Sequence, residues 1–398
     1  MFRLLRILFS IMVLLAFYPS QYYRPEFTII GYFLWAIGFV YLIKYHYKPS
    51  LFIIFLSFYQ IWMFATTCYR NSIDLHMLFS SMRIIIFFAM AEFVARYDTK
   101  NFVKIIFWGT FVFIFIDILS IYLYPNGLRH TGAFDLNEYI EQQKVWILGV
   151  KNNRVYWYLI VLISAYLIYY FDKSRKNKMF LVLYSLITLL TFIKIDADTS
   201  FVVFLISCSS IYLSSKIKKV SSKAMKRAFI IYFIIVFLII TGSLTSLASF
   251  VGNLFGKDAT FSGRTIIWGM VLAEIMNNPV WGSGIISSEE AIDLMGNYAF
   301  VNSHNQWLQT LWQGGLILLL VFVCFFYYGI KKITRQFIDV KLKFTFAVFI
   351  FALFVEMTME VIFTNYSCWT IMLLIYSVDQ FNKEKNNRLT RERKVYGR

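Results

Sequence analysis

The segment 102–124, FVKIIFWGTFVFIFIDILSIYLY, is a continuous apolar run with charges only at Lys104 and Asp117. A helix of about 20 apolar residues crosses the roughly 30 Å hydrocarbon core of a bilayer, so this segment predicts a transmembrane helix. Similar runs predict about twelve such helices, at 4–18, 27–43, 50–67, 77–95, 102–124, 155–171, 179–194, 199–215, 228–243, 308–330, 344–363 and 367–381. The runs do not alternate every second residue, which argues against a membrane barrel. We therefore expect an all-α polytopic membrane protein.

The overall composition agrees with this interpretation. Of the 398 residues, 59% are hydrophobic and only 15% are charged, whereas soluble chains carry about a quarter charged residues. This composition excludes an ordinary soluble enzyme and a disordered polymer. The net charge of +17 does not indicate nucleic-acid binding, because that function needs a basic face on a soluble domain.

The positions of the basic residues predict the topology, because Lys and Arg favour cytoplasmic loops. If the first span starts inside, most of the basic residues fall on inner segments such as 216–227, 331–343 and 383–398. A frame shifted by one span would place them outside. We therefore expect both termini in the cytoplasm, a single membrane domain over 1–381, and a basic cytoplasmic tail over 382–398 that lies near anionic headgroups.

Two outer loops are longer than a turn between helices requires, at about 125–154 and 244–306. Long loops on a rigid scaffold are where binding and catalytic residues usually lie. The inner loops are short and contain no glycine-rich phosphate loop of the kind that a nucleotide-driven pump needs. The large late outer loop is therefore the first place to look for a site.

This late loop predicts a helix that begins near Arg264 and stops before Pro279. Trp268 and Val271 follow Arg264 at helical spacing, so the three residues share one face. An arginine at the start of such a helix suits a phosphate, because its guanidinium forms paired hydrogen bonds and the helix end adds positive potential. The alternative is that Arg264 snorkels or pairs with an acid such as Asp258.

Further along the same loop, Pro279-Val-Trp-Gly282-Ser-Gly284 predicts a turn whose glycines let the backbone approach another group closely. A short amphipathic helix is expected over 287–295. His304 then lies where the loop meets the tenth span, and a histidine can transfer protons near neutral pH. A structural role is the alternative for a lone histidine at an interface.

These elements follow one another in an order that resembles the O-antigen polymerase/ligase superfamily, the Wzy and WaaL type. The resemblance rests on Arg264-x3-Trp268, Pro279-x2-Gly282-x-Gly284, His304-Asn305 and the pair Gly314-Gly315. The layout of spans with a large late outer loop extends it over the whole chain. One position departs from the ligase pattern: a second glycine is expected three residues after Gly315, and this chain has Leu318. That departure favours a polymerase over a ligase.

The resemblance implies a bacterial enzyme of the cytoplasmic (inner) membrane that acts at its outer face on undecaprenyl-diphosphate-linked sugars. One lipid-linked glycan is the donor, and a sugar hydroxyl of another is the acceptor. The family uses no metal, nucleotide sugar or other cofactor. A polysaccharide polymerase of this type joins repeat units of O antigen (lipopolysaccharide), capsule or exopolysaccharide. Its implied partners in the pathway are a chain-length regulator and a flippase.

Within this family picture, Arg264 is the first candidate for holding the diphosphate and His304 is the candidate base for the acceptor hydroxyl. A second basic arm is expected from the first outer loop, which offers Arg129, Lys151 and Arg154. The stretch Gly-Val-Lys151-Asn resembles a segment of capsule polymerases. Which of the three basic residues fills this role is left open.

The remaining candidates are sugar contacts and acids within the spans. Asn305, Trp268 and Trp307 are candidate sugar contacts, and membrane anchoring is the alternative for the tryptophans. Charges inside apolar runs are costly and therefore suggest function. Glu356 and Glu360, one helical turn apart in the eleventh span, are expected to line the glycan cavity with one of them facing the diphosphate arginines.

Other interpretations remain open at this point. Glu356 or Glu360 could instead pair with Arg83 for structural reasons, and Glu92 and Asp117 also lie in apolar runs. Within the family, the alternative is a ligase that transfers finished glycan to a lipid or wall acceptor. From another class, the alternative is a secondary transporter or a flippase for lipid-linked oligosaccharide, which inverted repeats with broken helices would favour. A single late loop with Arg and His favours the enzyme.

Overall fold

The computed structural model describes residues 2–19, 22, 25–70, 75–133, 141–151, 154–240, 264–295, 301–336, 339–363, 366–377 and 380–381. Most of these residues are helical. The helices are α1 (Phe2–Ala16), α2 (Pro25–Lys44), α3 (Leu51–Arg70), α4 (Leu75–Tyr97), α5 (Thr99–Leu123), α6 (Val155–Phe171), α7 (Arg175–Lys194), α8 (Asp198–Leu213), α9 (Ser222–Ile240), α11 (Arg264–Asn277), α12 (Ser288–Met295), α13 (Gln306–Gln336), α14 (Val340–Met359) and α15 (Tyr366–Tyr376). The strands β1 (Arg129–Ala133) and β2 (Glu141–Val145) form a two-stranded antiparallel sheet.

The predicted spans correspond to helices of the structure. Each predicted range lies largely on one helix, with the first nine ranges on α1 to α9 and the last three on α13 to α15. Eight of the described helices are long and apolar enough to cross a membrane: α2, α3, α4, α5, α7, α8, α13 and α14. The protein is therefore a multi-pass helical membrane protein. The full count of about twelve crossings and the cytoplasmic position of both termini remain predictions.

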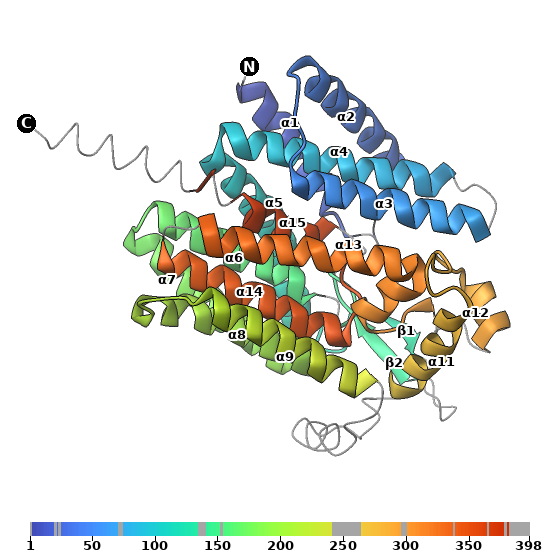
Figure 1. The fold of residues 1–398 in the computed structure, drawn as a ribbon. Helices are drawn as coiled ribbons and strands as arrows, with labels where there is room; N and C mark the ends of the chain where they lie inside the picture. Colours follow the sequence, from blue (N-terminus) through green and yellow to red (C-terminus); the bar gives the residue numbers. More distant parts are fainter. Residues whose placement is uncertain are drawn as a thin grey trace, which may run out of the picture.

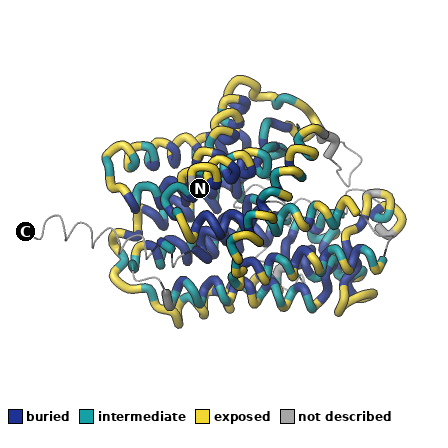
Figure 2. Tube along the Cα trace, turned by 90° about the horizontal axis from the view of Figure 1, so that it is seen from above, coloured by how far each residue is buried: buried dark blue, intermediate teal, exposed yellow. Residues whose placement is uncertain are grey.

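The shorter apolar helices α6 and α15 form the centre of the bundle. Residues 367–376 of α15 and 155–167 of α6 are all buried. The outer helices instead expose large apolar side chains, such as Ile29 and Phe33 on α2, which are 70% and 68% exposed. Figure 2 shows exposed residues along the outer faces of the helices. A large exposed apolar surface of this kind fits contact with lipid.

The bundle has two ends, and contacts between loops sort the connecting segments into two groups. At one end Arg6 pairs with Asp98, and the Tyr170 hydroxyl donates to Asp339 Oδ2 (2.9 Å). All four residues lie on or beside segments predicted to face the cytoplasm. At the other end, Figure 1 shows β1, β2, α11 and α12 close together. These contacts group the connecting segments as the predicted topology groups them, and which end faces the cytoplasm stays a prediction.

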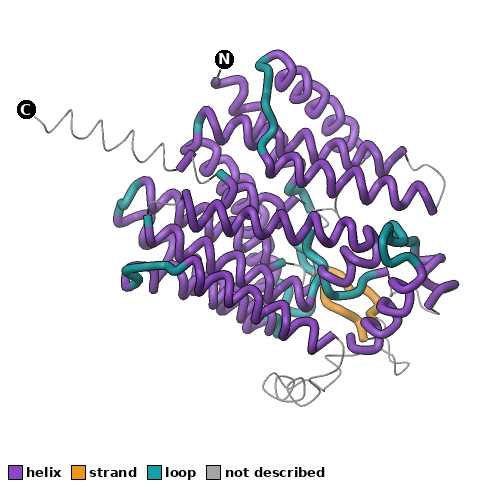
Figure 3. The backbone as a smooth tube through the Cα atoms, in the orientation of Figure 1, coloured by secondary structure: helices purple, strands orange, loops and turns teal. Residues whose placement is uncertain are grey.

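The first outer loop departs from the all-α prediction. Its strands pair with Arg129 opposite Val145, and the Leu128 N–H donates to Val145 O (2.8 Å). Gly127, with a φ of 86°, turns the chain into β1. Figure 3 shows this hairpin in orange among the helices. The all-α prediction is wrong for this loop, because short polar strands leave no mark in a search for long apolar runs.

The late outer loop contains the short helices that were expected there. α12 begins with a capping box, in which Ser287 Oγ accepts from the Glu290 N–H (3.2 Å) and the Glu290 carboxylate accepts from the Ser287 N–H (2.7 Å). The part of this loop at 244–263, which includes Asp258, lies outside the described residues, as does the tail 382–398.

Candidate functional site

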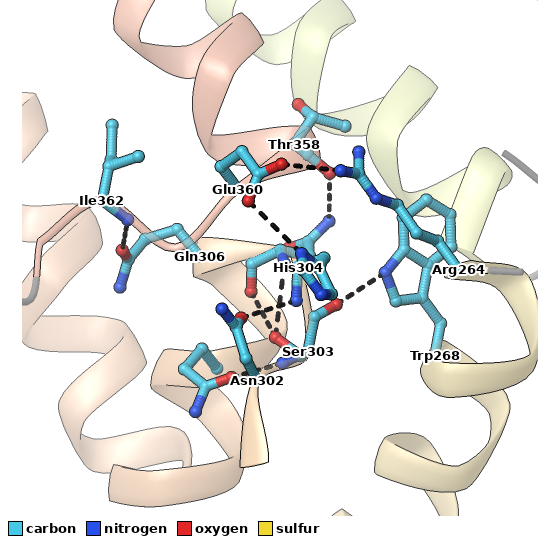
Figure 4. A network of polar contacts seen from close by, with 11 residues as sticks. Arg264, Trp268, Asn302, Ser303, His304, Gln306, Thr358, Glu360 and Ile362 are labelled. Atoms are coloured by element: carbon cyan, nitrogen blue, oxygen red, sulfur yellow. Dashed lines mark hydrogen bonds and ion pairs between the residues drawn. The ribbon is translucent and has the colours of Figure 1, made fainter. Parts of the chain in front are cut away.

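His304 lies in a tight turn immediately before α13. Its φ is 49°, a left-handed conformation that is uncommon for residues other than glycine. The His304 N–H donates to Asn302 Oδ1 (2.8 Å), and the Ser303 N–H donates to Gln309 Oε1 (2.8 Å). On the other side, Trp268 Nε1–H donates to Ser303 O (3.0 Å), as Figure 4 shows. Because Gln309 belongs to α13 and Trp268 to α11, two helices fix the turn.

Arg264 and His304 meet on one carboxylate, that of Glu360. Arg264 Nη2 donates to Glu360 Oε1 (2.6 Å), and His304 Nδ1 lies 3.3 Å from Glu360 Oε2 (Figure 4). The Glu360 side chain is 5% exposed, whereas those of Arg264 and His304 are 16% and 35% exposed. The carboxylate is therefore shielded while its two partners reach solvent. We call these residues the Arg264–Glu360–His304 cluster.

Glu360 reaches the cluster because α14 ends one residue before it. Its backbone is extended, with φ −144° and ψ 155°. The next residues are held by Gln306, whose Oε1 accepts from the N–H groups of Ile362 and Phe363 (2.9 Å each). Glu360 is the C-cap of α14 and lies one helical turn after Glu356, as predicted, because its N–H donates to Glu356 O (2.8 Å). The helix itself ends earlier than the predicted span, which ran to residue 363. The expectation that an acid from this part of the chain faces Arg264 is confirmed.

The glycines of the late loop hold it against the helix bundle. α13 is interrupted at Gly315, which has a φ of 66°. The loop 279–284 lies in this interruption: the Ser283 N–H donates to Trp312 O (2.8 Å), and the Leu316 N–H donates to Pro279 O (2.9 Å). A Cβ atom added at Gly282 would lie 2.4 Å from the Gly315 nitrogen. The predicted close approach of backbone is confirmed, and its partner is another part of this chain.

Comparison with known proteins now adds to this geometry. Residues 183–323 match the model of the O-antigen ligase family. Over these residues the chain is similar to the O-antigen ligase family. The match confirms the resemblance to the O-antigen polymerase/ligase superfamily. It includes Arg264 and His304 of the cluster, but Glu360 lies beyond its end. No curated protein matches the chain.

Arg154, one of the candidates for the second basic arm, is instead part of the protein interior. Its side chain and that of Asp117 are both fully buried, and Arg154 Nη1 lies 3.1 Å from Asp117 Oδ2. Asp117 also accepts from the Tyr158 hydroxyl (2.8 Å) and the Leu148 N–H (2.9 Å). Arg154 Nη2 donates to Gly149 O (2.5 Å). Arg154 is thus a structural residue that fixes the first outer loop, because no face of its guanidinium reaches a substrate.

Arg129 and Lys151 are both exposed. The Arg129 guanidinium lies over the ring of Tyr22, at 4.9 Å from its centre. No contact among the described residues joins Arg129 or Lys151 to the Arg264–Glu360–His304 cluster. A role for Arg129 or Lys151 in holding the diphosphate therefore stays a prediction.

The residues predicted to contact sugars are buried within the protein. Asn305 is fully buried, and its Oδ1 accepts from the N–H groups of Trp307 and Leu308 at the start of α13 (3.0 and 3.1 Å). Trp268 is fully buried and Trp307 is 7% exposed; the Trp307 indole donates to the Tyr232 hydroxyl (3.0 Å). In this arrangement these three residues support the His304 turn and do not present a surface to a sugar. Sequence reasoning missed this because it could not distinguish buried from exposed aromatic residues.

The other charged residues of the spans have separate surroundings. Glu92 pairs with Arg96 (2.5 Å), and the Arg83 guanidinium lies over the ring of Trp35 (5.6 Å). Glu356 is buried, and its carboxylate oxygens have no hydrogen-bond partner among the residues that the structure describes. The suggested pairing of Glu356 or Glu360 with Arg83 is not seen within the described part of the chain.

Proposed function

We propose that this protein is a polysaccharide polymerase that joins undecaprenyl-diphosphate-linked repeat units at the outer face of the bacterial cytoplasmic membrane. The observation that carries the proposal is the Arg264–Glu360–His304 cluster, in which one carboxylate holds a cation and a proton-transfer group side by side. The match of residues 183–323 to the O-antigen ligase family supports a lipid-linked glycan as the substrate. The cluster also lies at the end of the bundle that is predicted to face outward.

Arg264 is suited to the leaving group of this reaction. Only its Nη2 has a hydrogen-bond partner among the described residues, so its other N–H groups remain for the oxygens of a diphosphate. As the sugar leaves the diphosphate, negative charge grows on the bridging oxygen. A fixed guanidinium stabilises that charge without any rearrangement.

His304 is suited to the acceptor. When Nδ1 donates its hydrogen to Glu360, Nε2 carries a free electron pair and faces away from the carboxylate. In serine hydrolases a carboxylate orients an imidazole base in the same way. In the proposed step, the acceptor hydroxyl oxygen forms a bond to the anomeric carbon of the donor, the bond from that carbon to the diphosphate breaks, and the hydroxyl proton passes to His304 Nε2. Undecaprenyl diphosphate leaves with the electron pair.

A ligase is the second candidate, because the matching family is described as an O-antigen ligase. Leu318 supports the polymerase in preference. It stands at the closing position of the ligase glycine pattern, is fully buried, and occupies the space beside Gly314, where an added Cβ would lie 2.2 Å from the Leu318 side chain. The two activities differ in their acceptor: a polymerase extends another lipid-linked unit, and a ligase needs a different acceptor.

The test uses the purified protein with lipid-linked repeat units in a buffer that contains EDTA and no nucleotide. We expect a ladder of longer glycans, and we expect His304→Asn to slow chain growth by about 10²- to 10⁴-fold. His46→Asn is the matched control, because His46 also has a positive φ (48°) and is exposed in the connection between α2 and α3. Asparagine tolerates this conformation. An unchanged ladder from His304→Asn would refute the role of His304. Product only on a non-glycan lipid acceptor would indicate the ligase, and movement of the lipid-linked unit without any ladder would indicate a flippase.

A further inference from the structure

Beside the cluster lies a cavity that none of the steps above uses. Its volume is about 580 Å³, within the range of about 300–1,000 Å³ typical of ligand pockets. Its walls come from α3, α4, α6, α13, the loop after β2 and the segments around residues 301 and 361. The connections of these helices place it in the half of the bundle that carries the outer loops.

The cavity adjoins the cluster through two neighbouring residues. Asn302 lines the cavity and accepts the backbone N–H of His304 (2.8 Å). Val361 lines it directly after Glu360 in the chain. A group bound in the cavity can therefore contact Asn302, which bonds to His304, and Val361, which follows Glu360.

The lining of the cavity combines apolar and aromatic side chains with a few uncharged polar ones. No Asp, Glu, Lys, Arg or His is among the described residues that form its walls. Three polar side chains of the lining, Gln60, Ser81 and Gln313, have no hydrogen-bond partner among the residues that the structure describes. Gln60 and Ser81 are only 9% and 6% exposed. These three side chains therefore have hydrogen-bonding capacity left for a polar ligand in the cavity.

Aromatic side chains complete the walls. Trp157, at the outer end of α6, lines the cavity and is 8% exposed, and Tyr59 and Tyr156 line it as well. A sugar presents hydroxyl groups around its rim and C–H groups on its faces. It can therefore bond to the amides and the hydroxyl while its faces contact rings. A carboxylated sugar would lose its hydration here without gaining a charged partner, which is costly.

We infer that this cavity binds uncharged sugar residues of the glycan and that Gln60, Ser81 and Gln313 select them. The inference rests on the proposed function for the identity of the glycan. It adds that two parts of the substrate bind at two places. The diphosphate binds at Arg264, and the neutral sugars bind in the cavity on the other side of Asn302 and Val361.

The test measures binding separately from chain growth. The probe is the oligosaccharide released by mild acid from the host's lipid-linked repeat unit, and equilibrium dialysis measures its binding to the purified full-length protein. We expect Gln60→Met, Gln313→Met and Ser81→Ala each to weaken binding by about three- to tenfold, the effect of one lost hydrogen bond between uncharged groups. Oxidising the probe's primary hydroxyls to carboxylates is expected to weaken its binding to the wild-type protein by at least about tenfold.

Matched controls lie on the same or nearby elements outside the cavity. Ser57→Ala on α3 and Gln143→Met, exposed on β2, should leave binding unchanged. Arg264→Gln should abolish the ladder and leave binding of the oligosaccharide intact. No binding by the wild-type protein, equal binding of the oxidised probe, or unchanged binding by all three cavity variants would overturn the inference. Cavity-dependent binding without any ladder would overturn the polymerase proposal and leave the cavity assignment standing.

Discussion

Arg154 and Arg264 look alike in the sequence and differ in the structure. Each lies in a predicted outer loop at the start of a helix, and each pairs with a carboxylate from a predicted span or its end. Arg154 and Asp117 are both fully buried, and Asp117 accepts two further hydrogen bonds from the protein. The Arg264 side chain is 16% exposed, and its carboxylate is shared with His304, which is 35% exposed.

The difference separates a structural ion pair from a candidate catalytic one. Every charged atom of the Arg154 pair is used by the protein, so the pair stabilises the first outer loop and has nothing left for a ligand. Among the described residues, the Arg264 pair leaves N–H groups and an imidazole nitrogen without a partner at an accessible surface. Exposure and unused bonding capacity, more than the presence of an arginine, therefore mark the functional site.

The largest effect is expected from Arg154→Met. Removing one partner of a buried ion pair leaves Asp117 charged and uncompensated, which costs about 3–5 kcal/mol of the free energy of unfolding. Chemical denaturation in detergent measures this loss. The double variant Arg154→Met/Asp117→Asn should regain at least half of it, because the asparagine oxygen can accept from the Leu148 N–H while its NH₂ group donates to the Tyr158 hydroxyl. A single variant as stable as the wild-type protein would mean that the pair is not structural.

The next effect is expected from Arg264→Gln. The rate of chain growth should fall by about 10²- to 10³-fold, the usual effect of removing one group that stabilises developing negative charge. The free energy of unfolding should fall by less than for Arg154→Met, because the shielded Glu360 keeps His304 as a second partner. A folded variant that retains more than half of the wild-type rate would contradict the assignment.

A smaller effect is expected where the late loop meets α13. Gly315→Ala should destabilise the protein by about 1–3 kcal/mol, because the residue has a φ of 66° and an added Cβ would lie 2.1 Å from Val280 O. Gly269→Ala in α11 is the control, since an added Cβ has no atom within 4 Å. Helical Gly→Ala changes stabilise by about 0.5–1 kcal/mol. Equal unfolding free energies for the two variants would show that the loop does not depend on this contact.

The smallest effect is expected from Trp281→Ala. Trp281 is 60% exposed and only stacks on Trp62, with ring centres 5.5 Å apart. Its removal should change the free energy of unfolding by no more than about 0.5 kcal/mol. Trp268→Phe should cost about 1 kcal/mol, because it removes the hydrogen bond from the buried indole to Ser303. Chemical denaturation measures both variants. A larger loss of unfolding free energy from Trp281→Ala than from Trp268→Phe would contradict this ranking.

Much of the fold could be predicted because bilayer spans need long apolar runs, which are local in sequence. The helix at Arg264 and the glycine turn at Gly282 were also local patterns. Pairing could not be predicted in the same way: Arg264 and Glu360 are 96 residues apart, and Asp117 and Arg154 are 37 apart. The hairpin of β1 and β2 was missed because its strands are short and polar.

The candidate site was only partly within reach of the sequence. Arg264 and His304 were singled out by residue type and by a family resemblance. Glu356 or Glu360 was expected to face Arg264, but no signal showed which of the two it is or that His304 shares it. Glu360 was placed inside a helix because nothing local shows that Gln306 holds the chain extended after Met359. Arg154 was one of three candidates for the second basic arm, because a buried arginine and an exposed one look the same in the sequence.

The most direct test compares chain growth per folded molecule in two variants, Arg264→Gln and Arg154→Met/Asp117→Asn. Both remove an arginine paired with a carboxylate, and both are assayed with lipid-linked repeat units after the folded fraction has been isolated. The Arg264–Glu360–His304 assignment predicts a ladder close to wild type from the double variant and almost none from Arg264→Gln. A normal ladder from Arg264→Gln, or its loss only in the folded double variant, would contradict it.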